Sequence, residues 1–416
     1  VHSGQHLAMT CVGAFRVAAV ALALACVLGG VNARAERGVQ PRTALSGRTA
    51  VRLERAGALD HKPSLAQVSA LRGGGSSVAK SSASGGALLQ TLKVGMLFLA
   101  WYAFNIWYSL VAKMVLQFWK SPWLFTIIQL GIGSLWVAVQ WVPLPTFGLA
   151  GANSKYVTMR PVPKLSGSEI RALLPIATCL AAGHLASTFA MFYGTVAFAN
   201  VVKTAEPIFT CMFSALLLQQ FFSLPVYLTL LPIMGGVAYA SAKELQFSWI
   251  SLLTAMASNV AFALRAILAK VSMRAAADNN MSPANLFAVV NTLAFAVLAP
   301  IALLIEARGA GAGWSEAVSK GTTSADLIKL ILATGVTYYL YNELAFMCLG
   351  VVHPVTHAVA NTIKRVAVIA ISIVYFKNPV TKEGIIGSAV AVVGVMLYSI
   401  MLNNEQAATK AKVKAA

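Results

Sequence analysis

Long apolar runs dominate the chain from about residue 93 onward. Each run holds about 20 residues, which is the length that crosses a bilayer core of ~30 Å as an α-helix. Strands of a membrane barrel would instead appear as alternating segments of ~10 residues, and the sequence shows no such alternation. The pattern therefore predicts an all-α membrane protein with ten transmembrane helices. We place these helices at residues 93–117, 121–144, 169–193, 197–219, 224–242, 248–274, 283–306, 326–350, 354–376 and 381–402.

Short polar segments punctuate the apolar runs. Proline stands beside a capping residue at Ser121-Pro122, at Ser282-Pro283 and at Asn378-Pro379 before Thr381, as is typical of helix starts. The stretch 143–168, rich in proline and glycine, predicts a loop between the second and third helices. The stretch Arg308–Ser324 contains four glycines and predicts a second loop.

Three short matches relate the two halves of the hydrophobic region. They pair Leu110–Lys113 with Ile267–Lys270, Asn200–Lys203 with Asn361–Lys364, and Gly235–Ser241 with Val393–Ser399. The order is the same and the offset is always about 157–161 residues. We therefore predict two five-helix repeats, 91–245 and 246–403, followed by a basic C-terminal tail, 404–416. An odd number of spans inverts the second repeat, and inverted repeats place a substrate site near the membrane midplane where they meet.

Composition agrees with a membrane protein. The chain is 58% hydrophobic and only 11% charged, whereas soluble domains average about 25% charged residues. The net charge of +19 comes partly from residues 1–90, which hold ten Lys/Arg and three acidic residues. Because no basic stripe lies on a soluble domain, nucleic acid is not an expected partner.

The N-terminal region has the features of a targeting sequence. Arg16 precedes the apolar run Val17–Leu28, and small residues follow, so residues 1–33 resemble a secretory signal peptide. Residues 34–90 are rich in Arg, Ser, Ala and Gly, which is typical of an organelle transit peptide. Together they predict a plastid that is reached through the secretory route. The alternative is an N-terminal tail without a targeting role.

Cationic side chains inside the apolar runs are the main candidates for chemistry. Burying a lysine or arginine at the bilayer centre costs at least ~2.5–3.5 kcal/mol. Lys364 and Arg365 nevertheless stand side by side in the middle of the ninth run, with no acid within two turns along the chain. Lys203 lies in the fourth run, where Glu206 at i+3 offers it an intrahelical partner. Pro207 removes a backbone donor there and can leave a carbonyl free to line a cavity.

Three cations around one cavity favour a phosphate ligand. A phosphomonoester carries about −1.5 to −2 charges at pH 7 and three strong acceptor oxygens. Arginine supplies a planar fork of donors to such a group and lysine supplies a point charge. We therefore predict a phosphate pocket formed by Lys203, Lys364 and Arg365.

Other polar residues inside the apolar runs are weaker candidates for contact with a substrate. They are His184, Ser187, Tyr341 and Arg265, and each has an alternative interpretation as a structural residue. Lys113 and Lys270 lie near helix ends, where their side chains can reach the interface by snorkelling. The aromatic residues Trp101, Trp107, Trp119 and Trp123 are most simply an aromatic belt at the interface.

Several of these segments resemble signatures of the plastid triose-phosphate/phosphate translocators. The segments are Pro354–Val366, Leu340–Ala345, Lys203–Pro207, Gly183-His184 and Ser258–Phe262. The resemblance covers about residues 90–402. It implies a drug/metabolite-transporter fold in the inner plastid envelope and counter-exchange of inorganic phosphate with a phosphorylated solute.

The resemblance also implies roles for single residues. Lys203, Lys364 and Arg365 would hold the phosphate with help from Tyr341 and Ser187, and His184 would lie near the organic end of the substrate. We expect triose phosphate or 3-phosphoglycerate as the organic substrate, with hexose phosphates, pentose phosphates and phosphoenolpyruvate as alternatives. A nucleotide-sugar transporter of the endomembrane system is a further alternative. No metal, cofactor or enzymatic activity is expected.

Overall fold

The computed structural model of the protein describes residues 78–142, 158, 160–273, 281–352 and 354–415. The predicted signal peptide and most of the predicted transit segment lie outside these residues. The chain divides into two compact units, residues 1–95 and 96–416. The packing and the site described below belong to the second unit.

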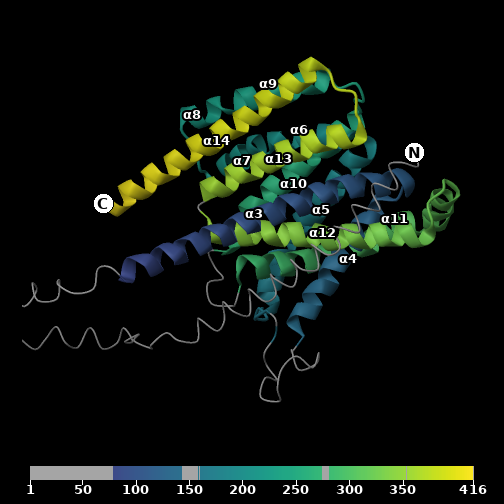
Figure 1. Ribbon diagram of the computed structural model, residues 1–416, viewed down its shortest axis with the longest axis horizontal. Helices are drawn as coiled ribbons and strands as arrows, with labels where there is room; N and C mark the ends of the chain where they lie inside the picture. Colours follow the sequence, from purple (N-terminus) through teal and green to yellow (C-terminus); the bar gives the residue numbers. More distant parts are fainter. Residues whose placement is uncertain (1–77, 143–157, 159, 274–280, 353, 416) are drawn as a thin grey trace, which may run out of the picture. The chain divides into compact units, whose positions relative to one another are not determined.

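Every element of the described region is a helix, and each of the predicted spans overlaps one helix or a broken pair (Figure 1). The helices are α3 (Val78–Phe118), α4 (Pro122–Trp141), α5 (Gly167–Tyr193), α6 (Val196–Val202), η5 (Lys203–Ala205), α7 (Glu206–Leu218), α8 (Leu224–Leu228), α9 (Leu230–Ala242), α10 (Trp249–Met273), α11 (Pro283–Ser319), α12 (Ser324–Val351), α13 (Pro354–Phe376) and α14 (Lys382–Ala415).

Nine helical segments of the described region are long and apolar enough to cross a membrane. The protein is therefore an all-helical membrane protein. Helix α12 is not among the nine, because its middle carries a run of polar side chains from Tyr338 to Glu343. The count of ten transmembrane helices thus stays a prediction.

The helix starts follow the predicted punctuation. Helices α4 and α11 begin at Pro122 and Pro283. The Thr381 hydroxyl accepts a hydrogen bond from the Gly384 amide at 3.0 Å and so caps the start of α14. Helix α5 begins with a capping box, in which Ser166 and Glu169 satisfy each other's free backbone amides.

The predicted loop Arg308–Ser324 is wrong, because helix α11 continues to Ser319. Tertiary contacts stabilise this glycine-containing end of the helix. Trp314 packs edge-on against Trp119 with ring centroids 5.8 Å apart, and Glu316 pairs with Lys120 at 3.0 Å. The predicted loop 143–168 lies largely outside the described residues, and the predicted C-terminal tail is the helical end of α14 through Ala415.

Helices at equivalent positions in the two predicted repeats pack against each other. Helix α4 packs on α11, α6 on α13, and α9 on α14, and α9 and α14 run side by side in Figure 1. Small residues allow the closest of these approaches. A Cβ atom on Gly236 of α9 would lie 2.4 Å from the Ala391 nitrogen, and one on Gly387 of α14 would lie 2.6 Å from the Ala240 nitrogen. The two-repeat organisation itself stays a prediction.

Candidate functional site

The fourth predicted span is broken at the point where its lysine stands. Helix α6 ends at Val202, the short 3₁₀ helix η5 covers Lys203–Ala205, and α7 begins at Glu206. Pro207 cannot donate to the carbonyl four residues earlier, which belongs to Lys203. The Glu206 amide turns to the Lys203 carbonyl in the 3₁₀ pattern, so the Val202 carbonyl also loses its α-helical donor.

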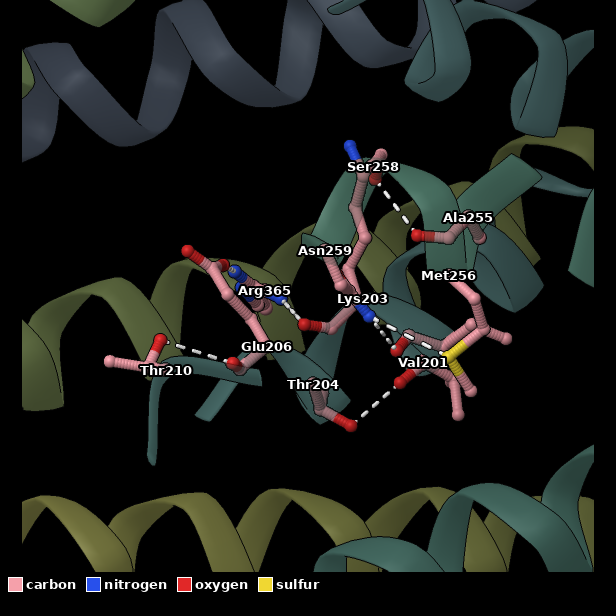
Figure 2. A network of polar contacts seen from close by, with 11 residues as sticks. Val201, Lys203, Thr204, Glu206, Thr210, Ala255, Met256, Ser258, Asn259 and Arg365 are labelled. Atoms are coloured by element: carbon pink, nitrogen blue, oxygen red, sulfur yellow. Dashed lines mark hydrogen bonds and ion pairs between the residues drawn. The ribbon is translucent and has the colours of Figure 1, made fainter. Parts of the chain in front are cut away.

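Side chains from the second half of the chain satisfy both carbonyls (Figure 2). The Asn259 amide of α10 donates to the Val202 carbonyl at 2.9 Å. The Arg365 guanidinium of α13 donates to the Lys203 carbonyl. Pro207 therefore leaves a backbone acceptor in the site, and Arg365 from the other half of the chain donates to it.

Glu206 pairs with Arg365 and not with Lys203. The Arg365 Nη2 atom lies 2.6 Å from the Glu206 Oε2 atom, and Figure 2 shows the two side chains facing each other. The expected intrahelical partnership of Lys203 with Glu206 is therefore wrong. Arg365 has no acidic residue near it along its own helix, but Glu206 at the start of α7 lies beside it in space.

All seven candidate residues line one cavity of about 290 Å³ between the helices. They are Lys203, Lys364, Arg365, Tyr341, His184, Ser187 and Arg265. They come from α5, α6–η5, α10, α12 and α13, so both halves of the chain contribute. Their role in binding a substrate stays a prediction.

The cavity is strongly positive. Among the described residues its lining includes four cations, from Lys203, Arg265, Lys364 and Arg365, and a single acid, Glu206. Glu206 pairs only with Arg365, and no ion pair involves the other three cations within the described part of the chain. Uncompensated charge in a membrane interior is costly, so the arrangement is suited to an anionic ligand.

Neutral polar groups complete the lining. The His184 Nε2 atom lies 2.8 Å from the Gln129 Oε1 atom, and the imidazole stacks on Tyr338 with ring centroids 4.0 Å apart. Three buried groups on the cavity wall have no hydrogen-bond partner among the described residues, the Trp101 Nε1 atom, the Ser187 hydroxyl and the Arg265 Nε atom. Buried polar groups without partners are uncommon, so these three are candidates for contact with a ligand.

Trp101 is part of the cavity wall and not of an interfacial belt. Its side chain is only 1% exposed. The Lys364 ammonium lies 4.8 Å from the centre of its ring, and His357 stacks on it with centroids 5.0 Å apart. The prediction of an aromatic belt is therefore wrong at this position. The spacing of tryptophans along one helix does not distinguish a lipid-facing ring from one that receives a cation.

Phe262 is a second residue that sequence reasoning missed as part of the wall. Its ring centre lies 5.8 Å from the Lys203 ammonium and 5.4 Å from the Arg265 guanidinium carbon. Gly183 on α5 makes room for it, since a Cβ atom there would lie 2.7 Å from the ring. Both residues fall in segments that carry the family resemblance, and that was the available signal.

Membrane-spanning helices around a small, cationic, polar cavity define a polytopic transporter for anions. The model of the Triose-phosphate Transporter family matches residues 92–399 of this chain, and the chain belongs to this family. The prediction of an all-α membrane protein and the predicted family resemblance are thereby confirmed.

Curated relatives carry the names of plastid phosphate translocators. The chain is 36% identical to phosphoenolpyruvate/phosphate translocator 2 of Arabidopsis thaliana over 76% of this chain and 78% of the relative. It is 33% identical to glucose-6-phosphate/phosphate translocator 2 of the same plant over 74% and 75%. It is 31% identical to the non-green-plastid triose phosphate/phosphate translocator of Brassica oleracea over 76% and 74%.

Proposed function

We propose that the protein is an antiporter that exchanges inorganic phosphate for a small phosphorylated organic compound across a plastid envelope membrane. Triose phosphate and 3-phosphoglycerate are the first expected substrates, and phosphoenolpyruvate, hexose phosphates and pentose phosphates are the alternatives. The relatives are named as chloroplastic phosphate translocators for several of these compounds. The inner envelope of a complex plastid is the proposed location, based on the two-part leader of the sequence.

The observation that carries this proposal is the charge of the cavity. Its formal charge is +3 from four cations and one acid among the described lining residues. A phosphate dianion offsets most of this charge and offers acceptors to Lys203, Lys364 and Arg365 together. The protein then acts as a carrier and not as an enzyme. Tyr341 and Ser187 help to hold the phosphate, and His184 lies near the organic part of the solute.

The size of the cavity favours a small solute. Pockets for drug-sized ligands span about 300–1,000 Å³, and this cavity of about 290 Å³ lies at the lower limit. A phosphate attached to three to six carbons suits this volume better than a nucleotide sugar does. We therefore rank the endomembrane nucleotide-sugar alternative below phosphate exchange.

The proposed mechanism is alternating access controlled by charge. Closing the empty cavity would strip water from Lys203, Arg265 and Lys364, which have no acid partner among the described residues, and desolvating unpaired charge is expensive. A bound phosphate dianion compensates them, so the loaded carrier reorients and the empty carrier does not. Obligatory exchange follows from this difference.

Exchange in proteoliposomes tests the proposal. Vesicles loaded with phosphate should take up labelled phosphate, and a panel of triose phosphate, 3-phosphoglycerate, phosphoenolpyruvate, hexose and pentose phosphates should reveal the organic substrate. Lys364→Ala should lower exchange by roughly tenfold to a hundredfold, the loss expected for a charge-assisted hydrogen bond. Lys120→Ala is the matched control, because Lys120 lies at the surface and pairs with Glu316.

Three results would contradict the proposal. They are near-normal exchange by Lys364→Ala, substantial phosphate efflux with no counter-substrate, and exchange of nucleotide sugars in place of phosphate. Equal losses in the Lys120 and Lys364 variants would show a general effect on the protein and not one on the cavity.

A further inference from the structure

The position of Lys113 near a helix end suggested that its side chain reaches the interface by snorkelling. In the structure the side chain bonds to helix α5 instead. Its ammonium donates to the carbonyls of Met191 and Gly194, both at 2.8 Å, and to that of Phe192 at 3.4 Å. These carbonyls belong to the last turn and the C-cap of α5. The last carbonyls of a helix have no donor within the helix, and its C-terminus favours a cation. Lys113 therefore ties α3 to the corner between α5 and α6.

This corner lies next to the cavity. Ser109 on α3 and Met191 on α5 line the cavity, and Lys113 lies about one helical turn beyond Ser109. Around the corner the side chains of Ala112, Val115 and Val196 are completely buried.

A second tie from another helix holds the same corner. The Ser251 hydroxyl of α10 donates to the Ala190 carbonyl of α5 at 2.8 Å. A Cβ atom on Gly194 would lie 2.2 Å from this hydroxyl oxygen, so a glycine at the C-cap of α5 makes room for the Ser251 side chain. Two donors, one from α3 and one from α10, thus fix the carbonyl end of α5 between them.

We propose that Lys113 is a gating residue, whose bonds to the α5–α6 corner hold this end of the cavity closed and are released when the carrier opens on that side. The proposal rests on the proposed function only in assuming a carrier with alternating access. In that cycle α3 and α5 must separate at this end to admit a solute. The Lys113 ammonium bonds to the corner from α3, so breaking its bonds contributes to the free energy of that opening.

One-sided labelling of a cavity cysteine tests the gate without any transported substrate. Ala199 lines the cavity and is 1% exposed, so Ala199→Cys in a background with the five native cysteines replaced by alanine is a suitable reporter. An impermeant thiol reagent is added to sealed vesicles of known orientation, first from one side and then from the other. The rate from each side reports how often the cavity opens there.

Lys113→Met should raise labelling from the side of the α5–α6 corner about tenfold and should not raise it from the opposite side. A factor of ten is the lower end of what the loss of a charge-assisted hydrogen bond produces. Lys113→Arg keeps the charge and the donors and should label close to the parent rate. Lys120→Met makes the same change at a surface lysine and should leave both rates unaltered.

A purely structural cap predicts a different pattern. Lys113→Met would then lower the melting temperature and leave the two labelling rates in their original ratio, and this result would overturn the proposal. If Lys113→Met does not fold, Ser251→Ala removes the second tie and should shift labelling in the same direction by a smaller factor. A folded Ser251→Ala protein with an unchanged ratio would also overturn it. Phosphate exchange measured on the parent protein tests the proposed function separately, so the two failures can be distinguished.

Discussion

Replacing Glu206 by glutamine tests whether the net charge of the cavity controls phosphate binding. In the structure the Arg365 guanidinium is bound to Glu206 at 2.6 Å, so an incoming phosphate must compete with a resident carboxylate for that arginine. Glu206→Gln keeps the shape of the side chain and removes the competitor. It also raises the formal charge of the described cavity lining from +3 to +4. We therefore expect the substitution to strengthen phosphate binding.

The magnitude follows from the environment of the pair. A hydrogen bond between charged groups contributes about 1.5–3 kcal/mol when it is well buried. Here the side chains are 15% and 29% exposed, and water weakens such pairs. A value just below this range, roughly 1.4 kcal/mol, corresponds to about a tenfold gain in phosphate affinity.

Thermal unfolding in detergent at increasing phosphate concentration provides the measurement. A ligand that binds only the folded state stabilises it by RT ln(1 + L/Kd), where L is the free ligand concentration, so a fit of melting temperature against phosphate concentration gives an apparent Kd, which is the half-saturating concentration. The half-saturating phosphate concentration of Glu206→Gln should be about tenfold lower than that of the parent. Glu316→Gln removes a surface acid that pairs with Lys120 and Lys320, and it should leave this concentration unchanged.

An opposite result would refute the reasoning. If Glu206 is needed to hold Arg365 in position, then Glu206→Gln will weaken phosphate binding, and the half-saturating concentration will rise. An unchanged value would show that Arg365 does not meet the phosphate. The melting temperature without phosphate separates both outcomes from a simple loss of stability.

Two further predictions concern packing and the cavity wall. Gly236→Ala should destabilise the protein by about 1–3 kcal/mol through overpacking, because its Cβ would lie 2.4 Å from the α14 backbone. Gly235→Ala meets no atom within 4 Å, so equal melting temperatures for the two variants would exclude the close contact. Trp101→Leu should raise the phosphate KM of exchange roughly twofold to tenfold by removing the cation–π contact with Lys364. Trp249→Leu, at a tryptophan that is 68% exposed, should not change it, and equal KM values for the two variants would argue against this contact.

The positions of the helices and the main cavity residues could be predicted from the sequence. Apolar length alone located the helices, and Lys364 and Arg365 stood out because charge inside an apolar run has few explanations. The loss of a helical donor at Pro207 was also predictable, since proline has no backbone N–H whatever the surrounding structure is. These inferences depend only on local chemistry.

Pairings between distant elements could not be predicted in the same way. Glu206 is three residues from Lys203, so local spacing assigned it to that lysine, whereas the 3₁₀ turn and the packing of α13 bring it to Arg365. The predictions for Trp101 and Lys113 were wrong for the same reason. Position along one helix suggested an interface for both, and the partners that bury them, Lys364 and the end of α5, come from other helices.

The way in which the two halves complete each other explains why a phosphate solute can control the carrier. The break in the first half leaves the Val202 carbonyl without a helical donor and leaves the Lys203 carbonyl with only the Glu206 amide, and Asn259 and Arg365 of the second half donate to these two carbonyls. Arg365 also binds Glu206 of the first half. Any movement that separates α13 from α7 must therefore leave a guanidinium and a carboxylate unpaired in a partly buried site, which is unfavourable. A phosphate in the cavity offers Arg365 substitute acceptors that can move with α13. On the proposed mechanism, the same arginine that recognises the solute thus couples its presence to the relative movement of the two halves.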